Sequence, residues 1–219
     1  SGTTSQDVTV SLSSSSSATE GTDYGTVSDI TISAGATTGT TTFTPTDDSM
    51  YETSTNETAI ISIDGVSGGS AVENGTPQAV TITITENESA PTVTLATSAT
   101  SIAENAGSSL TLTATLSGTT SQDVTVSLSS SSSATEGTDY GTVSDITITS
   151  GSTTGTASFT PTDDSLYDAA SDETAIIAIS GVSGGGATES GTQTVTITIT
   201  DNESAPTVTL STSATSIAE

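Results

Sequence analysis

The sequence predicts an all-β protein made of tandem antiparallel seven-stranded β-sandwiches, and three observations support this fold class. Apolar residues alternate with Thr and Ser in short runs, which is the period of a half-buried strand. Gly-, Ser- and Asp-rich turns separate these runs, and helical spacing is absent from the sequence. A long internal repeat indicates that the same sandwich occurs more than once along the chain.

Seven strands are predicted in residues 91–205, in the order 92–95, 109–116, 123–128, 146–148, 156–159, 174–179 and 193–200. The run TVTL opens the domain after a Pro-containing turn. SLTLTATL, DVTVSL and, at the end, QTVTITIT alternate clearly, and the short runs ITI and TASF lie between them. TAIIAI is apolar on both faces and is predicted to be the most buried strand. The predicted core face carries Leu110, Leu112, Val124, Val126, Leu128, Val195, Ile197 and Ile199, and Thr or Ser covers the other face.

The repeat has a period of about 115–116 residues. Residues 1–32 recur unchanged at 117–148, and the offset falls from 116 to 115 after Pro77, which has no counterpart. Such a period is a whole domain copied in tandem rather than a short solenoid coil. The turn NESAP, at 87–91 and 202–206, is the predicted junction.

The positions of these junctions predict three segments in the chain. Residues 1–90 are a partial sandwich that lacks its first strands, 91–205 are a complete sandwich, and 206–219 are the first strand of a further repeat. Continuing from Glu219 to Ser1 requires the twelve residues that stand at 105–116. Two explanations stay open: two periods cut from a longer array, or a repeat whose missing strand comes from a neighbour.

The charge balance is one-sided. The chain has 26 Asp and Glu residues and no Lys, Arg or His, which gives a formal net charge of −26. Nucleic acid and anionic membrane surfaces are therefore excluded as partners, because both would be repelled. There is no Cys to form a disulfide, and no run approaches the ~20 apolar residues of a membrane span. With 30% hydrophobic and 3% aromatic residues, each domain is expected to have a thin core.

The acidic residues of 91–205 gather in four stretches, SIAEN, TEGTDY, PTDDSLYDAASDET and ITDNES. In a sandwich of this topology all four stretches lie at one tip. Close carboxylates repel by ~1 kcal/mol or more per pair, so such a tip needs a cation. Oxygen donors without nitrogen or sulfur favour calcium over zinc or magnesium. Solvated acidic loops without a metal are the competing interpretation.

The same stretches resemble the Calx-beta domain family. The matching motifs are IAEN (102–105), ATEGTDY (134–140), TDDSLYDAASDET (162–174) and TITDNE (198–203), in the family's order, and 1–90 repeats the last three. The resemblance implies a Calx-beta-type sandwich that holds calcium through Glu104, Asp139, Asp163, Asp164, Asp168, Glu173 and Asp201, with Glu203 as a further candidate. The implied equivalents in the first repeat are Asp23, Asp47, Asp48, Glu52, Glu57 and Glu86. Glu219 would begin a third site.

The expected function is that of a non-enzymatic, calcium-stabilised and calcium-rigidified repeat in a secreted, extracellular or cell-surface protein. It would form an extended, adhesin-like stalk or filament whose partners are calcium ions, adjacent repeats and neighbouring subunits. Catalysis is disfavoured because neither Ser-His nor Cys-His pairs can form and no Trp offers a sugar platform. The alternatives are a metal-independent filament with strand exchange between subunits and, with less support, an ice- or surface-binding protein suggested by the Thr rows.

Overall fold

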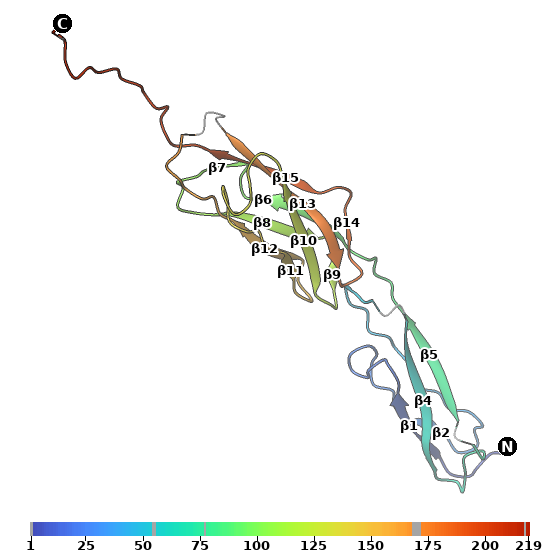
Figure 1. Cartoon of the computed structure of the whole chain (residues 1–219). Helices are drawn as coiled ribbons and strands as arrows, with labels where there is room; N and C mark the ends of the chain where they lie inside the picture. Colours follow the sequence, from blue (N-terminus) through green and yellow to red (C-terminus); the bar gives the residue numbers. More distant parts are fainter. Residues whose placement is uncertain (1, 54–55, 77, 168–171, 217) are drawn as a thin grey trace. The chain divides into compact units, whose positions relative to one another are not determined.

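The chain folds into two compact units, Ser1–Ser89 and Ala90–Glu219. The structure is a computed structural model that describes residues 2–53, 56–76, 78–167, 172–216 and 218–219. Within these ranges all regular structure is β, in fifteen strands (Figure 1). None of the described residues belongs to a helix that is long and apolar enough to cross a membrane. The predicted all-β fold class is confirmed.

The second unit is a sandwich of two sheets. One sheet has the order β11 (Ile146–Ile148), β10 (Val124–Ser131), β13 (Glu173–Ser183), β15 (Thr194–Thr200) and β7 (Ser101–Ala103). The other has the order β12 (Thr154–Phe159), β8 (Leu110–Leu116), β6 (Thr92–Thr97) and β14 (Thr188–Glu189). Each of the seven predicted strands is present; β7, β14 and the two-residue β9 (Thr119–Thr120) are additional.

Strands β6 and β7 follow each other in the chain but belong to opposite sheets. β6 pairs antiparallel with β8 and parallel with β14, whereas β7 pairs parallel with β15. The short link between them therefore crosses from one sheet to the other. One continuous segment, residues 92–103, thus contributes to both layers of the sandwich.

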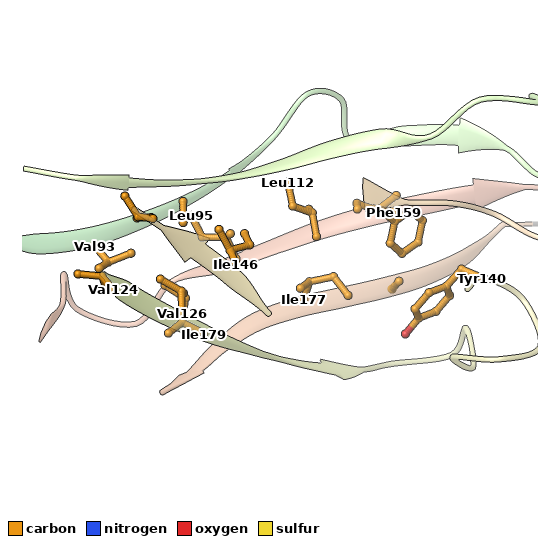
Figure 2. Packing of buried hydrophobic residues seen from close by; sticks show 14 of the residues in the cluster. Val93, Leu95, Leu112, Val124, Val126, Tyr140, Ile146, Phe159, Ile177 and Ile179 are labelled. Atoms are coloured by element: carbon orange, nitrogen blue, oxygen red, sulfur yellow. The ribbon is translucent and has the colours of Figure 1, made fainter. Parts of the chain in front are cut away.

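The core lies between the two sheets, as the alternation predicts. Figure 2 shows side chains of both sheets, among them Leu112 and Ile177, meeting in the layer between them. On β13 the residues Ala175, Ile177 and Ile179 are buried, and the residues between them are half-buried. β13 is flanked by β10 and β15, so it is a central strand of its sheet, which explains why it is apolar on both faces.

The first unit has the counterpart of only one of these sheets. Its strands have the order β2 (Ile30–Ile32), β1 (Val8–Ser15), β4 (Asn56–Ser67) and β5 (Ala79–Thr85), with a two-residue β3 at Met50–Tyr51. In the register of the repeat, the counterparts of β6 and β8 would fall before residue 1. Residues 38–43, the counterpart of the edge strand β12, form no strand in this described segment. The apolar face of the sheet is consequently open.

The last residues, 206–219, contain no strand in their described part, and all of those described are exposed. Their counterpart in the repeat is the segment that forms β6 and β7. Here no neighbouring strand from this chain pairs with them within the described ranges. The predicted domain boundaries, 1–90, 91–205 and 206–219, stay predictions.

The repeat provides a matched pair of core mutations. Replacing Ile177, which is fully buried, with Ala should lower the free energy of unfolding of the second unit by about 2–5 kcal/mol. The same change at its counterpart Ile61 should cost clearly less, because Ile61 keeps contact with solvent. Hydrogen-exchange mass spectrometry in increasing urea resolves the two units. Equal losses at the two positions would contradict the different packing of the units.

Candidate metal site

The acidic stretches of the second unit meet at one end of the sandwich, around a small cavity. Six carboxylates line it, together with Thr162 and Ile199: Glu104, Asp139, Asp164, Asp172, Glu173 and Asp201. The cavity has a volume of about 10 Å³, about the space that a single water-sized particle requires. The structure therefore brings together residues that are almost 100 positions apart in the sequence.

Each carboxylate is placed by the end of a strand or by a tight turn. Glu104 follows β7, and its backbone N–H donates to Thr200 O at 3.1 Å, which ties it to the end of β15. Glu173 is the first residue of β13, and Asp201 directly follows β15. Because β7, β13 and β15 are neighbours in one sheet, their ends deliver these three carboxylates to the same edge.

The turn that carries Asp139 is anchored in the core by an aromatic pair. Tyr140 is buried and stacks on Phe159, with ring centroids 4.7 Å apart. Asp139 Oδ2 accepts a hydrogen bond from Thr135 N–H at 2.6 Å, which closes the turn around Gly137. Gly137 has φ +87°, a backbone conformation that favours glycine. The GTDY motif thus fixes the position of one carboxylate through a buried Tyr.

The loop after β12 is tied to the same turn. Pro161 forms an isolated β-bridge with Tyr140, and Thr162 N–H donates to Asp139 O at 3.0 Å. Further along, Asp164 Oδ1 accepts from Leu166 N–H at 2.6 Å, which curls the loop back. Asp164 therefore lies at the cavity beside Asp139 although twenty-four residues separate them.

Glu203 completes the cluster and has one oxygen without a donor. Carboxylate oxygens of Glu203, Glu104 and Asp164 lie within 4.8 Å of one another. Glu203 Oε2 is buried and receives no hydrogen bond from any described residue. Hydrogen bonding to Glu104 and to Asp201 raises the pKa of Glu203 to about 7, since the neighbouring carboxylates favour its protonated form. The partner that this oxygen lacks in the described structure is a proton, a water molecule or a cation.

The first unit has an equivalent cluster around a larger cavity of about 50 Å³. Its lining includes the acidic residues Asp23, Asp48, Glu52, Glu57, Glu86 and Glu88. Tyr24 is buried and stacks on Phe43 at 4.6 Å, so the same aromatic anchor holds the Asp23 turn. Asp23 Oδ2 accepts from Thr19 N–H at 2.5 Å, as Asp139 does from Thr135.

The carboxylates of the first cluster also disturb one another's titration. Burial and the nearby charges of Asp23, Asp48 and Glu86 raise the pKa of Glu52, and burial with Asp23 and Glu52 raises that of Glu57. A hydrogen bond to Glu86 raises the pKa of Glu88. Burial by itself would raise the pKa of Glu86, but hydrogen bonds from Glu88, Glu52 and Asn87 lower it. Proton uptake is therefore shared across the cluster.

Most of the predicted residues lie at the two cavities. In the second unit, Glu104, Asp139, Asp164, Glu173 and Asp201 line the cavity and Glu203 adjoins it, whereas Asp163 lines a neighbouring hollow that also includes Glu104. In the first unit, Asp23, Asp48, Glu52, Glu57 and Glu86 line the cavity, and Asp47 accepts a hydrogen bond from Asn87 at 3.1 Å beside it. Asp168 lies outside the described residues. Glu219 is exposed and lines neither cavity as described. Their role as ligands stays a prediction.

The prediction missed two acidic residues at these cavities. Glu88 is the counterpart of Glu203 at the offset of 115, so the repeat itself contained the signal. Asp172 has Asn56 as its counterpart, so the repeat gives no matching carboxylate. Asp172 belongs to the acidic stretch 161–174 that the sequence places at the tip, but it is not among the named ligands. Its φ of +92° is a left-handed conformation that Asp tolerates better than most residues.

Two other acids of the second unit, Asp123 and Asp145, do not line the cavity and bind backbone N–H groups elsewhere. Asp145 accepts from Leu128 N–H at 3.0 Å and from Ser127 Oγ–H at 2.9 Å, at the point where the register of β10 and β13 shifts. Asp123 accepts from Ser150 N–H at 2.8 Å. These side chains fix turns and a β-bulge, away from the cavity, and they show that acidity alone does not define the site.

The donor set at the tip fits a hard divalent cation. All of its charged donors are carboxylate oxygens, and one carboxylate oxygen, Glu203 Oε2, is buried without a donor in the described structure. Oxygen ligands in a flexible loop arrangement suit calcium, whereas zinc prefers His or Cys and magnesium requires strict octahedral geometry. The residues present therefore fit the ion that the sequence motifs imply.

Comparison with known proteins shows the family of this chain. The model of the Calx-beta domain matches residues 1–88 and 86–203. The chain belongs to the Calx-beta domain family. The predicted membership is thus confirmed, and the chain carries two Calx-beta segments in tandem.

Three solved Calx structures are similar to this chain. The apo form of the Calx CBD1 domain has 18% identity and a TM-score of 0.42, over 51% of this chain and 98% of that one. CBD12 from CALX1.2 has 14% identity and a TM-score of 0.39, over 90% and 89% of the two chains. The calcium binding domain CBD12 of CALX1.1 has 12% identity and a TM-score of 0.36, over 90% and 88%. No curated protein matches the chain.

The raised pKa of Glu203 predicts a pH dependence of stability in the metal-free protein. A carboxyl group with a pKa of about 7 when folded and 4.5 ordinarily binds more protons in the folded state. Its stabilising contribution is complete below the ordinary pKa and is lost as the pH rises through about 7. The urea midpoint of the second unit, measured in EDTA, should therefore fall over this window.

The variant Glu203→Gln should flatten this part of the pH profile, since its side chain stays uncharged. Asp64→Asn is the matched control, because Asp64 is exposed and lies outside both clusters. A pH slope in Glu203→Gln equal to that of the unaltered protein would assign the dependence to other groups.

Proposed function

We propose that each Calx-beta unit binds calcium at its carboxylate cluster, and that the chain is a non-enzymatic, calcium-stabilised repeat of an extracellular stalk or filament. One observation carries the proposal. Carboxylates crowd around a shielded oxygen that has no donor in the described structure, in a chain without a single cationic side chain. The chain belongs to the Calx-beta family, whose domains bind calcium, and this supports the same ion here.

In the second unit, two groups of carboxylates would contribute to calcium binding. Glu104, Asp164 and Glu203, whose oxygens already lie close together, would hold the ion, and Asp139, Glu173 and Asp201 would complete the oxygen shell. Bound calcium supplies the positive charge that the chain lacks. The backbone N–H groups of Thr135, Leu166 and Glu203 orient three of the carboxylates before the ion arrives.

The proposed effect is mechanical as well as thermodynamic. The carboxylates belong to the ends of β7, β13 and β15 and to two loops, so an ion that draws them together fastens these segments to one another. Without it, like charges push the same segments apart. Calcium would therefore stiffen the tip of each unit, which is what a repeat in an extended stalk requires.

Location and the lack of catalysis are parts of the same proposal. We place the protein outside the cell or on its surface, where calcium reaches the millimolar concentration that sites with a Kd of ~0.1–1 mM require. The acidic surface and the tandem repeat are typical of adhesin-like proteins. His, Cys and Lys are missing from the sequence, so an imidazole base, a thiolate nucleophile and an amine nucleophile are not available.

Calcium at a few millimolar should stabilise the second unit by about 1–3 kcal/mol, since only the folded state has the assembled site. Differential scanning calorimetry with EDTA or with calcium measures this as a rise in Tm. Glu104→Gln and Asp164→Asn should remove most of the rise in the second unit, and Asp64→Asn, which changes the same charge elsewhere, should keep it. Identical melting in EDTA and in excess calcium would refute the proposal.

A further inference from the structure

The turn between β4 and β5 contains the one Asn-Gly pair of the sequence. Of the five Asn residues in the chain only Asn74 is followed by Gly; the others are Asn56, Asn87, Asn105 and Asn202. At the offset of 116, the counterpart of Asn74 in the second unit is Ser190, which is also followed by Gly. The two turns therefore differ in the side chain that precedes the glycine.

The backbones of the two turns are closely matched. Gln78 N–H donates to Glu73 Oε1 at 2.8 Å, and the counterparts of these two residues form the same bond in the second unit at 2.6 Å. Gly75 and Gly191 have φ values of +69° and +66°, a left-handed conformation that glycine adopts without steric cost. The second unit is consequently a built-in reference for the chemistry of the first turn.

The Asn74 side chain is exposed and is not held by hydrogen bonds. Asn74, Gly75 and Thr76 are all exposed, and no described residue forms a hydrogen bond with the Asn74 carboxamide. A Cβ atom placed on Gly75 would meet nothing within 4 Å. Gly75 N–H donates to Glu73 O at 2.9 Å, a local bond in an exposed turn rather than part of a strand ladder. The Gly75 nitrogen can therefore approach the carboxamide carbon.

The accessibility of this turn does not depend on the covering strands. In the second unit, where both sheets are present, Gly191 and Thr192 are exposed, and a Cβ on Gly191 would also meet nothing within 4 Å. Ser190 is half-buried because its N–H donates to Val93 O at 2.9 Å, but no described residue bonds its hydroxyl group. A complete sandwich thus leaves the same position open to water.

We propose that Asn74 is a site of spontaneous deamidation, a covalent modification that Ser190 prevents at the matching turn. The Gly75 backbone nitrogen forms a bond to Asn74 Cγ, the carboxamide nitrogen leaves as ammonia, and a succinimide ring results. Water then opens the ring at either carbonyl carbon. One product is aspartate in a normal backbone, and the other is isoaspartate, in which the backbone runs through the side chain. The reaction consumes water and requires no enzyme, oxidant or cofactor.

The other Asn residues are less able to react. Each is followed by a residue with a Cβ, which restricts the approach of the backbone nitrogen. After Asn87 and Asn202, the next backbone N–H donates to a carboxylate, Glu86 Oε1 at 2.9 Å and Asp201 Oδ1 at 2.8 Å. The carboxamides of both Asn residues also donate to acidic side chains. Sequence and structure therefore both single out Asn74.

Both products change the turn. A carboxylate at position 74 adds a negative charge next to Glu73, whose side chain accepts the Gln78 N–H bond, and the two charges repel. Isoaspartate also adds one carbon atom to the backbone of the turn. The start of β5 is thereby loosened, whereas Glu86 and the carboxylate cluster lie at its other end. The modification is independent of the proposed calcium function.

Ageing the purified 219-residue chain at neutral pH, followed by peptide mass spectrometry, tests the proposal. A Glu-specific protease cuts after Glu73 and Glu189 and releases residues 74–86 and 190–203 as matched peptides. Peptide 74–86 should gain about one dalton and divide into aspartate and isoaspartate forms. The other Asn residues should convert at least about tenfold more slowly. A sample digested before ageing corrects for conversion during digestion.

Two variants move the reactive pair between the units. Asn74→Ser reproduces the Ser-Gly pair of the second unit and should abolish the change in residues 74–86. Ser190→Asn should create it at position 190, which fragmentation of peptide 190–203 locates. Both exchange one small polar side chain for another in a turn, so neither should unfold the chain, which circular dichroism checks. Gly75→Ala should slow the conversion at Asn74 by at least about tenfold.

The outcomes separate this proposal from the calcium proposal. Conversion at Asn74 that is no faster than at the other four Asn residues overturns it, as does conversion that occurs only after urea unfolds the chain, since the folded turn would then block the reaction. The calcium-dependent rise in Tm should be the same before and after ageing, and the same in Asn74→Ser. A chain that converts at Asn74 but melts identically in EDTA and calcium supports deamidation and refutes the calcium site.

Discussion

Repulsion between carboxylates that no basic group can neutralise is the constraint on which this structure depends. Each acidic oxygen has three means of compensation: a backbone or hydroxyl donor, a proton, or an external cation. Asp123 and Asp145 use the first, and they fix turns and a β-bulge. The neighbours of Glu203 are themselves acidic, and its raised pKa shows that a proton can compensate its charge. The carboxylate clusters at the tips have the ligand chemistry that an external cation requires.

Core and tip are built from the same strands, so their stabilities are coupled. β13 carries the buried Ile177 in its middle and Glu173 at its start, and Tyr140 packs in the core next to Asp139 at the cavity. A cation that holds the tip therefore also restrains the ends of the core strands. Conversely, the aliphatic core is thin, so the positions of the carboxylates depend on the aromatic pair Tyr140–Phe159 and on the strand ends.

The sequence was sufficient to predict the strands and most of the carboxylates at the tip, because both follow from local patterns and from the repeat. Alternation located all seven main strands, and the GTDY and acidic motifs located most of the carboxylates. β7 escaped because three residues, Ser101–Ala103, carry too little pattern and their place depends on pairing with β15. Asp172 was not named as a ligand because its place at the cavity follows from a left-handed turn. Glu88 was overlooked although the repeat makes it the counterpart of Glu203. The positions of β7 and Asp172 depend on tertiary contacts rather than on local propensity.

The segment that crosses between the sheets explains why core and site are completed together. In the second unit, Val93 and Leu95 fill the core from one sheet, and β7 then carries the chain across to the other sheet, where Glu104 follows at the tip. Glu104 comes only nine positions after Leu95, so one short stretch both covers apolar surface and adds a charge to the cluster. Any chain segment that closes this kind of sandwich must therefore satisfy a hydrophobic and an electrostatic requirement at once. A cation at the tip satisfies both requirements: without it the added carboxylate is repelled by its neighbours, and with it the carboxylate becomes a ligand.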